Sequence, residues 1–219
     1  MKRTQRSPWI AAGLAVLAGT ALADVGAISR PRSVLDPAPA DVGYISPECR
    51  QFLYVPVDAT SVELRWSQRL SLAACRDQVA ILPVSEYEGL QPLVTSLDNH
   101  AAPSIAIYRD AGSNGPTRIR ILATYALGMT YLDTAVRARS AVRPGAQFGG
   151  PTYGNAAYYE ELNKLHAALE PLLARDLRAA SAAFEEVGFL AEDYPIPAMS
   201  SSLMRSVVRN ARTQAQLLR

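Results

Sequence analysis

The sequence predicts an all-α fold, a single helical bundle of four to five helices with an extended, disulfide-stapled N-terminal arm. Apolar residues recur every three or four positions over long stretches, and clusters of Pro and Gly separate these stretches. The stretch 119–136 carries no charged residue between Ile121 and Leu132. A helix that is apolar on nearly all sides must be covered by protein, so we expect it at the centre of the bundle. Within it, Ala126 and Gly128 leave room for neighbouring backbones to approach closely.

The N-terminus has the pattern of a bacterial secretory signal peptide. Lys2, Arg3 and Arg6 precede an apolar run from residue 10 to 18, and Ala21-Leu22-Ala23 supplies the small residues that a signal peptidase requires. The run is too short to favour the alternative, a retained membrane anchor. We therefore expect residues 1–23 to be removed. The mature chain, without a transmembrane segment, is expected to be exported to the periplasm or the extracellular space.

The charge of the mature chain is close to zero. The sequence holds 22 basic and 20 acidic residues, and Lys2, Arg3 and Arg6 lie in the removable segment. Global charge therefore gives no reason to expect a nucleic acid as the partner. A hydrophobic content of 49% with a charged content of 19% is typical of a folded globular chain, so we expect one well-packed domain.

Two segments of different composition precede the first helix. Residues 24–47 contain Pro31, Pro37, Pro39 and Pro47 and are predicted to form a flexible, Pro-rich tether. Residues 51–57 are rich in aromatic and branched side chains, which predicts a short extended piece that is covered by protein. The helical bundle domain is therefore expected over residues 48–219.

Cys49 and Cys75 are the only cysteines, and we expect them to form a disulfide. Cys75 lies in the first predicted helix, which opens with the capping-box pattern Thr60-Ser61-Val62-Glu63 and runs to about Leu82. That helix has two apolar stripes, one made of Val62, Trp66, Leu70 and Ala73 and the other of Leu64, Leu72, Cys75 and Val79. Residues 52–57 would cover the second stripe, held there by the disulfide. Two cysteines in an exported chain most often pair, so two free thiols are the less favoured alternative.

Three further helices are predicted besides the central one. A kinked or two-piece helix should run from Glu86 to about Ala111, because Pro92 and Pro103 interrupt it. The longest helix should run from residue 155 to about 190, with a kink at Pro171. The last helix should be capped by one of the serines at 200–202, and its apolar stripe is Met204, Val207, Val208, Ala211, Ala215 and Leu218.

Leu127-Gly128 with Tyr131, and Ala180 with Phe184, form two short pieces that are similar to the first and second helices of a tetratricopeptide repeat. The two pieces lie roughly 50 positions apart, whereas one repeat spans about 34 residues. The resemblance therefore does not predict a repeat architecture for this chain.

Arginines recur along one side of the last helix. Arg205, Arg209, Arg212 and Arg219 line up beside its apolar stripe, and no acidic residue follows Asp193. This side is a candidate contact surface for a partner protein or an anionic envelope component. The alternative, which we favour, is that the arginines lie along the bundle edge and pair with acidic residues of a neighbouring helix.

Sequence signals for catalysis, metal ions and cofactors are weak. The chain has two histidines, His100 and His166, without an HExxH or ExxH motif, and the Gly-rich stretch 143–155 does not match a phosphate-binding loop. We therefore name no catalytic, metal-binding or cofactor-binding residue and expect no cofactor. A small-molecule pocket is a further hypothesis, formed by Tyr153, Tyr158, Tyr159 and His166.

The sequence supports two hypotheses of function. The first is an exported periplasmic scaffold or protein-interaction domain, because interaction requires no catalytic constellation. The second is a small-molecule binder or enzyme that uses the pocket of tyrosines and histidine. A closed bundle with an exposed apolar or arginine-lined surface favours the first, and a deep cavity with converging polar groups favours the second.

Overall fold

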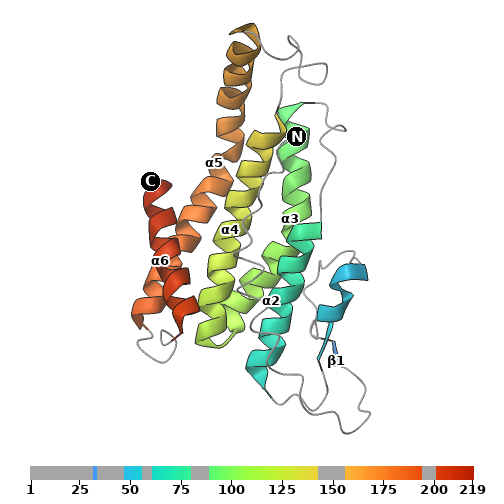
Figure 1. Cartoon of the computed structure of the whole chain (residues 1–219), viewed down its shortest axis with the longest axis vertical. Coiled ribbons are helices and arrows are strands. Elements are labelled where there is room, and N and C mark those ends of the chain that lie inside the picture. The colour runs from blue at the N-terminus through green and yellow to red at the C-terminus, as the bar shows by residue number, and fades with distance from the viewer. Residues whose placement is uncertain (1–31, 34–46, 56–60, 80–88, 143–155, 194–200) are drawn as a thin grey trace.

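The computed structural model describes residues 32–33, 47–55, 61–79, 89–142, 156–193 and 201–219 (Figure 1). These residues form five α-helices: α2 (Val62–Val79), α3 (Leu90–Asn114), α4 (Thr117–Ala141), α5 (Ala156–Asp193) and α6 (Ser202–Leu217). A 3₁₀ helix, η1 (Pro47–Phe52), and two strands, β1 (Arg32–Ser33) and β2 (Tyr54–Val55), precede them. The predicted all-α bundle is confirmed, while the predicted signal peptide lies outside the described residues.

Helix α4 lies at the centre of the bundle, as the sequence predicts. It packs against α3 on one side and α5 on the other, while α2 rests against α3 and α6 rests against α5 (Figure 1). Buried residues are spread around α4 from Ile119 to Ala141 rather than confined to one stripe. Among the described helices, none combines the length and the hydropathy that a membrane span requires.

Gly128 on α4 makes room for the aromatic ring of Phe184 on α5. A Cβ atom added at Gly128 would lie 2.7 Å from Cε1 of that ring and 2.9 Å from Cδ1, closer than side chains normally approach. Tyr125 packs against the same ring, with the two centroids 5.9 Å apart. The close approach expected at Gly128 is present, but the neighbour is an aromatic side chain rather than a second backbone.

Serine side chains cap two of the helices. Ser61 Oγ accepts a hydrogen bond from the Leu64 backbone N–H at 3.2 Å, so the second residue of the predicted capping box is the cap of α2. Ser201 Oγ accepts from the Met204 N–H at 3.2 Å and caps α6. The predicted serine cap of the last helix is therefore confirmed.

Prolines interrupt neither α3 nor α5. Helix α3 starts after Gly89, whose φ of 105° lies in the left-handed region that favours glycine. Pro92 consequently falls in the first turn, where the missing N–H costs nothing because those groups have no intrahelical partner. The helix then continues through Pro103, and α5 continues through Pro171. Of the two alternatives predicted for residues 86–111, a kinked or a two-piece helix, the two-piece helix is wrong, because α3 is continuous from Leu90 to Asn114. Residues 86–88 lie outside the described residues.

The N-terminal arm is fastened to α2 by the predicted disulfide between Cys49 and Cys75. Cys49 lies in η1 and is fully buried, and Phe52 and Leu53 pack against the main core. The covering arm is therefore present, although the piece predicted as extended begins in a 3₁₀ helix. Strand β2 then pairs antiparallel with β1, so two residues of the predicted tether take part in a short ladder.

The two stripes predicted on α2 are buried to different extents. Leu70 and Ala73 of the first stripe and Leu72 of the second are fully buried. Val62 is 53% exposed and does not belong to the covered part of the first stripe, because it stands in the first turn of the helix.

Buried apolar residues form two clusters along the bundle. The larger unites η1, α2, α6 and the facing parts of α3, α4 and α5, with Tyr108, Phe184 and Met204 among its largest members. The smaller unites the start of α3, the end of α4 and the middle of α5: Leu93, Val94, Leu97, Ala135, Ala138, Ala141, Val142, Leu169 and Leu173. Along the helices, polar residues lie at the junction of the two clusters. We call this set the polar layer, and it consists of Asp77, His100, Thr130, Thr134 and Asp176.

Candidate functional site

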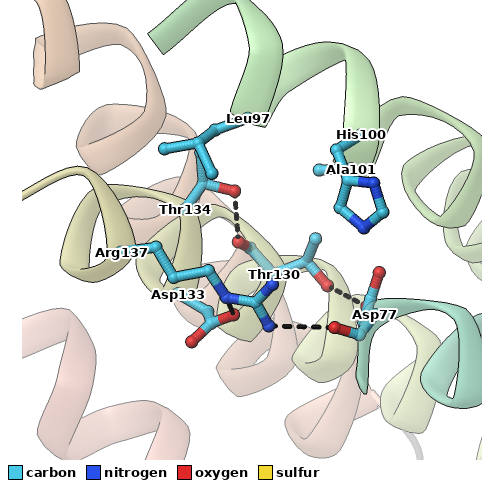
Figure 2. Close-up of a pocket in the computed structure, with 8 residues that line it drawn as sticks. All are labelled: Asp77, Leu97, His100, Ala101, Thr130, Asp133, Thr134 and Arg137. Atoms are coloured by element: carbon cyan, nitrogen blue, oxygen red, sulfur yellow. Dashed lines mark hydrogen bonds and ion pairs between the residues drawn. The ribbon is translucent and has the colours of Figure 1, made fainter. Parts of the chain in front are cut away.

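Asp77, near the C-terminal end of α2, links three helices within the polar layer (Figure 2). Thr130 Oγ1 of α4 donates a hydrogen bond to Asp77 Oδ2 at 3.0 Å, and the Tyr108 hydroxyl of α3 donates to the same oxygen at 3.4 Å. Arg137 Nη2 of α4 donates to the Asp77 backbone carbonyl at 2.9 Å. A single residue thus joins α2 to both α3 and α4.

Burial in the bundle raises the pKa of the Asp77 carboxyl to about 6. Hydrogen bonds from the hydroxyls of Ser104 and Thr130, together with the positive charge of Arg137, oppose this rise, while the charge of Asp133 adds to it. Loss of solvation is therefore the dominant effect. The carboxyl group of Asp77 therefore changes its charge at about pH 6, whereas an ordinary aspartate does so at about pH 4.

The hydroxyl of Thr130 has two acceptors and one hydrogen. Its Oγ1 lies 3.0 Å from Asp77 Oδ2 and 3.0 Å from the backbone oxygen of Ala126. When Asp77 is ionised, the hydroxyl serves only one of these acceptors at a time. When Asp77 is protonated, its carboxyl donates to Oγ1 and the Thr130 hydroxyl serves Ala126. Protonation of Asp77 therefore completes the local hydrogen bonding.

His100 projects from α3 toward Asp77 (Figure 2). Its Nε2 atom is buried and has no hydrogen-bond partner among the described residues. Burial lowers the pKa of His100, and the positive charges of Arg137 and Arg76 lower it further. The imidazole is therefore neutral at neutral pH, with one polar nitrogen left unsatisfied inside the protein.

A cavity of about 10 Å³ lies between these groups, which is close to the space that a single water molecule needs. Its lining comes from α2, α3 and α4: Asp77, Leu97, His100, Ala101, Thr130, Asp133, Thr134 and Arg137 (Figure 2). Aspartate, histidine and threonine are residue types that serve in acid–base catalysis. Here the threonine hydroxyl bonds the aspartate, so these two groups are already engaged with each other.

A second buried carboxyl group, that of Asp176 on α5, completes the polar layer. Arg175 Nε donates to Asp176 Oδ1 at 3.0 Å, and Arg175 Nη2 reaches Asp98 Oδ2 of α3 at 2.5 Å. Burial raises the pKa of Asp176, and the nearby Asp98 raises it further against the opposing effect of Arg175. Asp176 is fully buried, and its Oδ2 has no partner among the described residues. No group of three or more His, Cys, Asp or Glu side chains in the described part of the chain is arranged to hold a metal ion.

No protein-family model matches this chain, and no curated protein or solved structure matches it either. Its function therefore has to be inferred from its own residues and their geometry.

The predicted pocket of tyrosines and histidine lies partly outside the described residues, because Tyr153 is not among them. Tyr158 is buried, whereas Tyr159 is 56% exposed and meets the Tyr158 ring edge to face at a centroid distance of 5.4 Å. His166 Nε2 lies 3.3 Å from the backbone oxygen of Arg139. The two described tyrosines thus face different surroundings, and His166 is directed toward α4.

Of the four predicted contact arginines, Arg205, Arg209 and Arg212 lie in α6 and Arg219 follows its C-terminal end. Arg212 Nη2 pairs with Glu192 of α5 at 3.2 Å, and Arg219 Nη2 pairs with Glu185 of α5 at 3.1 Å. Arg205 and Arg209 are exposed.

Sequence analysis did not single out the polar layer. Two signals were available: an aspartate two positions after the disulfide cysteine Cys75, and threonines at positions 130 and 134 in an otherwise apolar helix. Neither signal gives the pairing, because the spacing of residues within one helix does not show which residue of another helix lies opposite.

Proposed function

We propose that this chain is an exported helical scaffold that binds another protein of the cell envelope and does not transform a small molecule. The basic start and the Ala21-Leu22-Ala23 pattern support export. The disulfide between Cys49 and Cys75 fits an oxidising compartment.

An exposed aromatic residue on the outer side of α5 is the observation that carries the proposal. Phe189 is 62% exposed, although the residues around it in the chain, such as Val187 and Leu190, are buried. Glu185 and Glu192 lie about one helical turn before and after Phe189, on the same side of α5. Glu192 is ion-paired with Arg212 of α6, and Glu185 with Arg219, which follows the end of α6. We call this surface the Phe189 face; its residues are Phe189, Glu185, Glu192, Arg212 and Arg219.

A large apolar side chain between charged groups is the arrangement of an interface anchor with a polar rim. Ion pairs on this rim contribute little to folding because water screens them, so they are free to adjust to a partner. Arg205 and Arg209 extend the positive side of the surface along α6. The partner surface that fits is an apolar pocket wide enough for a phenyl ring, with acidic groups beside it.

Site-specific photocrosslinking tests this proposal in the exported protein. A photoreactive amino acid in place of Phe189 should form one discrete covalent adduct with an envelope protein. The same amino acid in place of Tyr159 is the matched control, because Tyr159 is a similarly exposed aromatic residue of the same helix. Arg209→Glu should reduce the adduct at position 189. Equal labelling at both positions, or no discrete adduct at position 189, would contradict the Phe189 face as the binding surface.

Export is tested separately by the mass of the protein recovered from the envelope. The first residue should be Asp24, because signal peptidase cleaves after the small residue Ala23. Replacing Ala21 and Ala23 by larger residues should block cleavage and leave the N-terminal segment attached. A native product that retains Met1 and stays in the membrane would contradict the proposal that the chain is exported and cleaved.

A further inference from the structure

His100 and Asp77 face each other across the cavity of the polar layer, and each has unused hydrogen-bonding capacity (Figure 2). His100 Nε2 is buried without a partner among the described residues. The hydrogen bonds from Thr130 and Tyr108 both reach Oδ2 of Asp77, and Ser104 supplies a third hydrogen bond to the carboxyl group, whereas a carboxylate has about four lone-pair sites on its two oxygens. An unsatisfied buried nitrogen is costly, so a polar occupant between these groups would stabilise the folded state.

The charges around the cavity favour a neutral occupant. Asp77 is faced by Arg76 of its own helix, by Arg137 and Asp133 of α4, and by the uncharged Ser104 and Tyr108 of α3. Arg137 Nε pairs with Asp133 Oδ2 at 2.5 Å, which neutralises both charges. A cation would meet the two arginines, and an anion would meet the carboxyl group of Asp77. Water is therefore the occupant that matches both the volume and the charges.

We propose that one water molecule occupies this cavity and links His100 Nε2 to the carboxyl group of Asp77. A water at this place finds the two or more polar partners that buried waters require. With Asp77 ionised, the water donates one hydrogen to the carboxylate and serves His100 with its other hydrogen or its oxygen, according to the imidazole tautomer. With Asp77 protonated, the carboxyl donates to Thr130 Oγ1, and the water keeps its hydrogen bond to the other carboxyl oxygen.

The water adds a third hydrogen-bonded link to the two direct links that already join Asp77 of α2 to α4 and α3. Asp77 binds α4 through Thr130 and α3 through Tyr108. The water would extend this to His100, roughly two turns earlier on α3. Asp77, Thr130, Tyr108 and His100 would then form one hydrogen-bonded unit around the water.

A crystal structure of the mature protein at high resolution tests the proposal directly. We expect one ordered water within hydrogen-bonding distance of both His100 Nε2 and an Asp77 carboxyl oxygen. An empty cavity, a direct bond between the two residues, or an anomalous signal from a bound ion would overturn it. The wild-type protein suffices for this test, so the result does not depend on a variant that folds.

Nuclear magnetic resonance tests the same water in solution. Cross-relaxation between a long-lived water and the ring protons of His100 should be present in the wild type. Ala101→Val should abolish it, because Ala101 lines the cavity and the added methyl groups fill it. Ala102→Val is the matched control, since Ala102 is the next residue and is exposed. An unchanged signal in folded Ala101→Val, or its loss in both variants, would overturn the assignment of the water to this cavity.

Discussion

Gly128 has no side chain, and a Cβ atom at this position would clash with the ring of Phe184. In an open helix, replacing Gly by Ala would add about 1 kcal/mol of stability. Here the ring is fully buried and cannot move away freely. Gly128→Ala should therefore lower the free energy of unfolding by roughly 1–3 kcal/mol, as measured by urea denaturation.

Gly188 on α5 provides the matched control for Gly128. No atom lies within 4 Å of the Cβ position at Gly188, so Gly188→Ala should raise the free energy of unfolding by up to about 1 kcal/mol. Phe184→Leu should partly relieve the cost of Gly128→Ala in the double variant, because the two positions are in contact. If Gly128→Ala and Gly188→Ala stabilised the protein equally, the Phe184 ring would have to move away from residue 128 at little energetic cost.

Asp77 makes the stability of the protein depend on pH. Its pKa is about 6 in the folded protein against an ordinary value of 3.8, so the folded state binds the proton more tightly than the unfolded chain. The free energy of unfolding should therefore fall as the pH rises from about 4 to about 6, by on the order of 2–3 kcal/mol, and stay lower above that window. Asp176, whose pKa is also raised, contributes with the same sign.

Asp77→Asn should remove the Asp77 part of this dependence, because the amide does not titrate. Denaturant unfolding of the variant and the wild type between about pH 4 and pH 7 measures the difference in slope. Asp193→Asn is the control, since Asp193 is exposed at the end of α5 and is not among the groups that act on the pKa of Asp77. If Asp77→Asn kept the full slope of the wild type, another group would have to be responsible.

Among the elements, the N-terminal arm depends most on a single covalent bond. η1 and β2 are short, and the disulfide from Cys49 to Cys75 closes a loop with a sequence separation of 26. A closed loop of this length limits the unfolded chain and should contribute about 3 kcal/mol. Reduction should therefore lower the melting temperature, and a variant with alanine at both positions should melt at the lower temperature with no further response to reductant. Two titratable thiols in the native exported protein would contradict the bond.

Helix α6 is held to the bundle by its apolar stripe rather than by its arginines. Met204 is fully buried in the larger cluster, so Met204→Ala should cost roughly 2–5 kcal/mol. Arg212 and its partner Glu192 are both more than half exposed, so Arg212→Ala should cost less than about 1 kcal/mol. Urea denaturation of the two variants separates these contributions. If the two variants lost comparable free energy of unfolding, the ion pairs between α5 and Arg212 or Arg219 would stabilise the fold substantially. They would then be less available to a partner.

Across the whole molecule, the two apolar clusters predict unequal local stability. In residues 156–170 of α5 the buried residues are Tyr158 and Leu169, whereas seven buried residues follow between 173 and 190. Amide hydrogen exchange should therefore be faster in the first part of α5 than in the second, because fewer buried contacts must break to open it. Uniform protection along α5 would contradict this prediction.

The sequence by itself determined the helical class, the central place of α4, the serine cap of the last helix and the pairing of the two cysteines. Each follows from local spacing or from a count: the charge-free run 121–132, the serines around position 201, and two cysteines in one chain. The continuity of α3 through Pro103 did not follow, because packing on both sides of a helix can outweigh the loss of one backbone hydrogen bond.

Only the tertiary structure decided what the polar residues do. Asp77, His100 and Thr130 lie on three different helices, and periodicity within one helix says which side a residue occupies but not which residue of another helix it meets. The same holds for Phe189, whose exposure depends on how the neighbouring helices pack around α5. Burial and electrostatic environment are properties of the assembled bundle, so the protonable layer and the proposed binding surface arise only when the helices pack together.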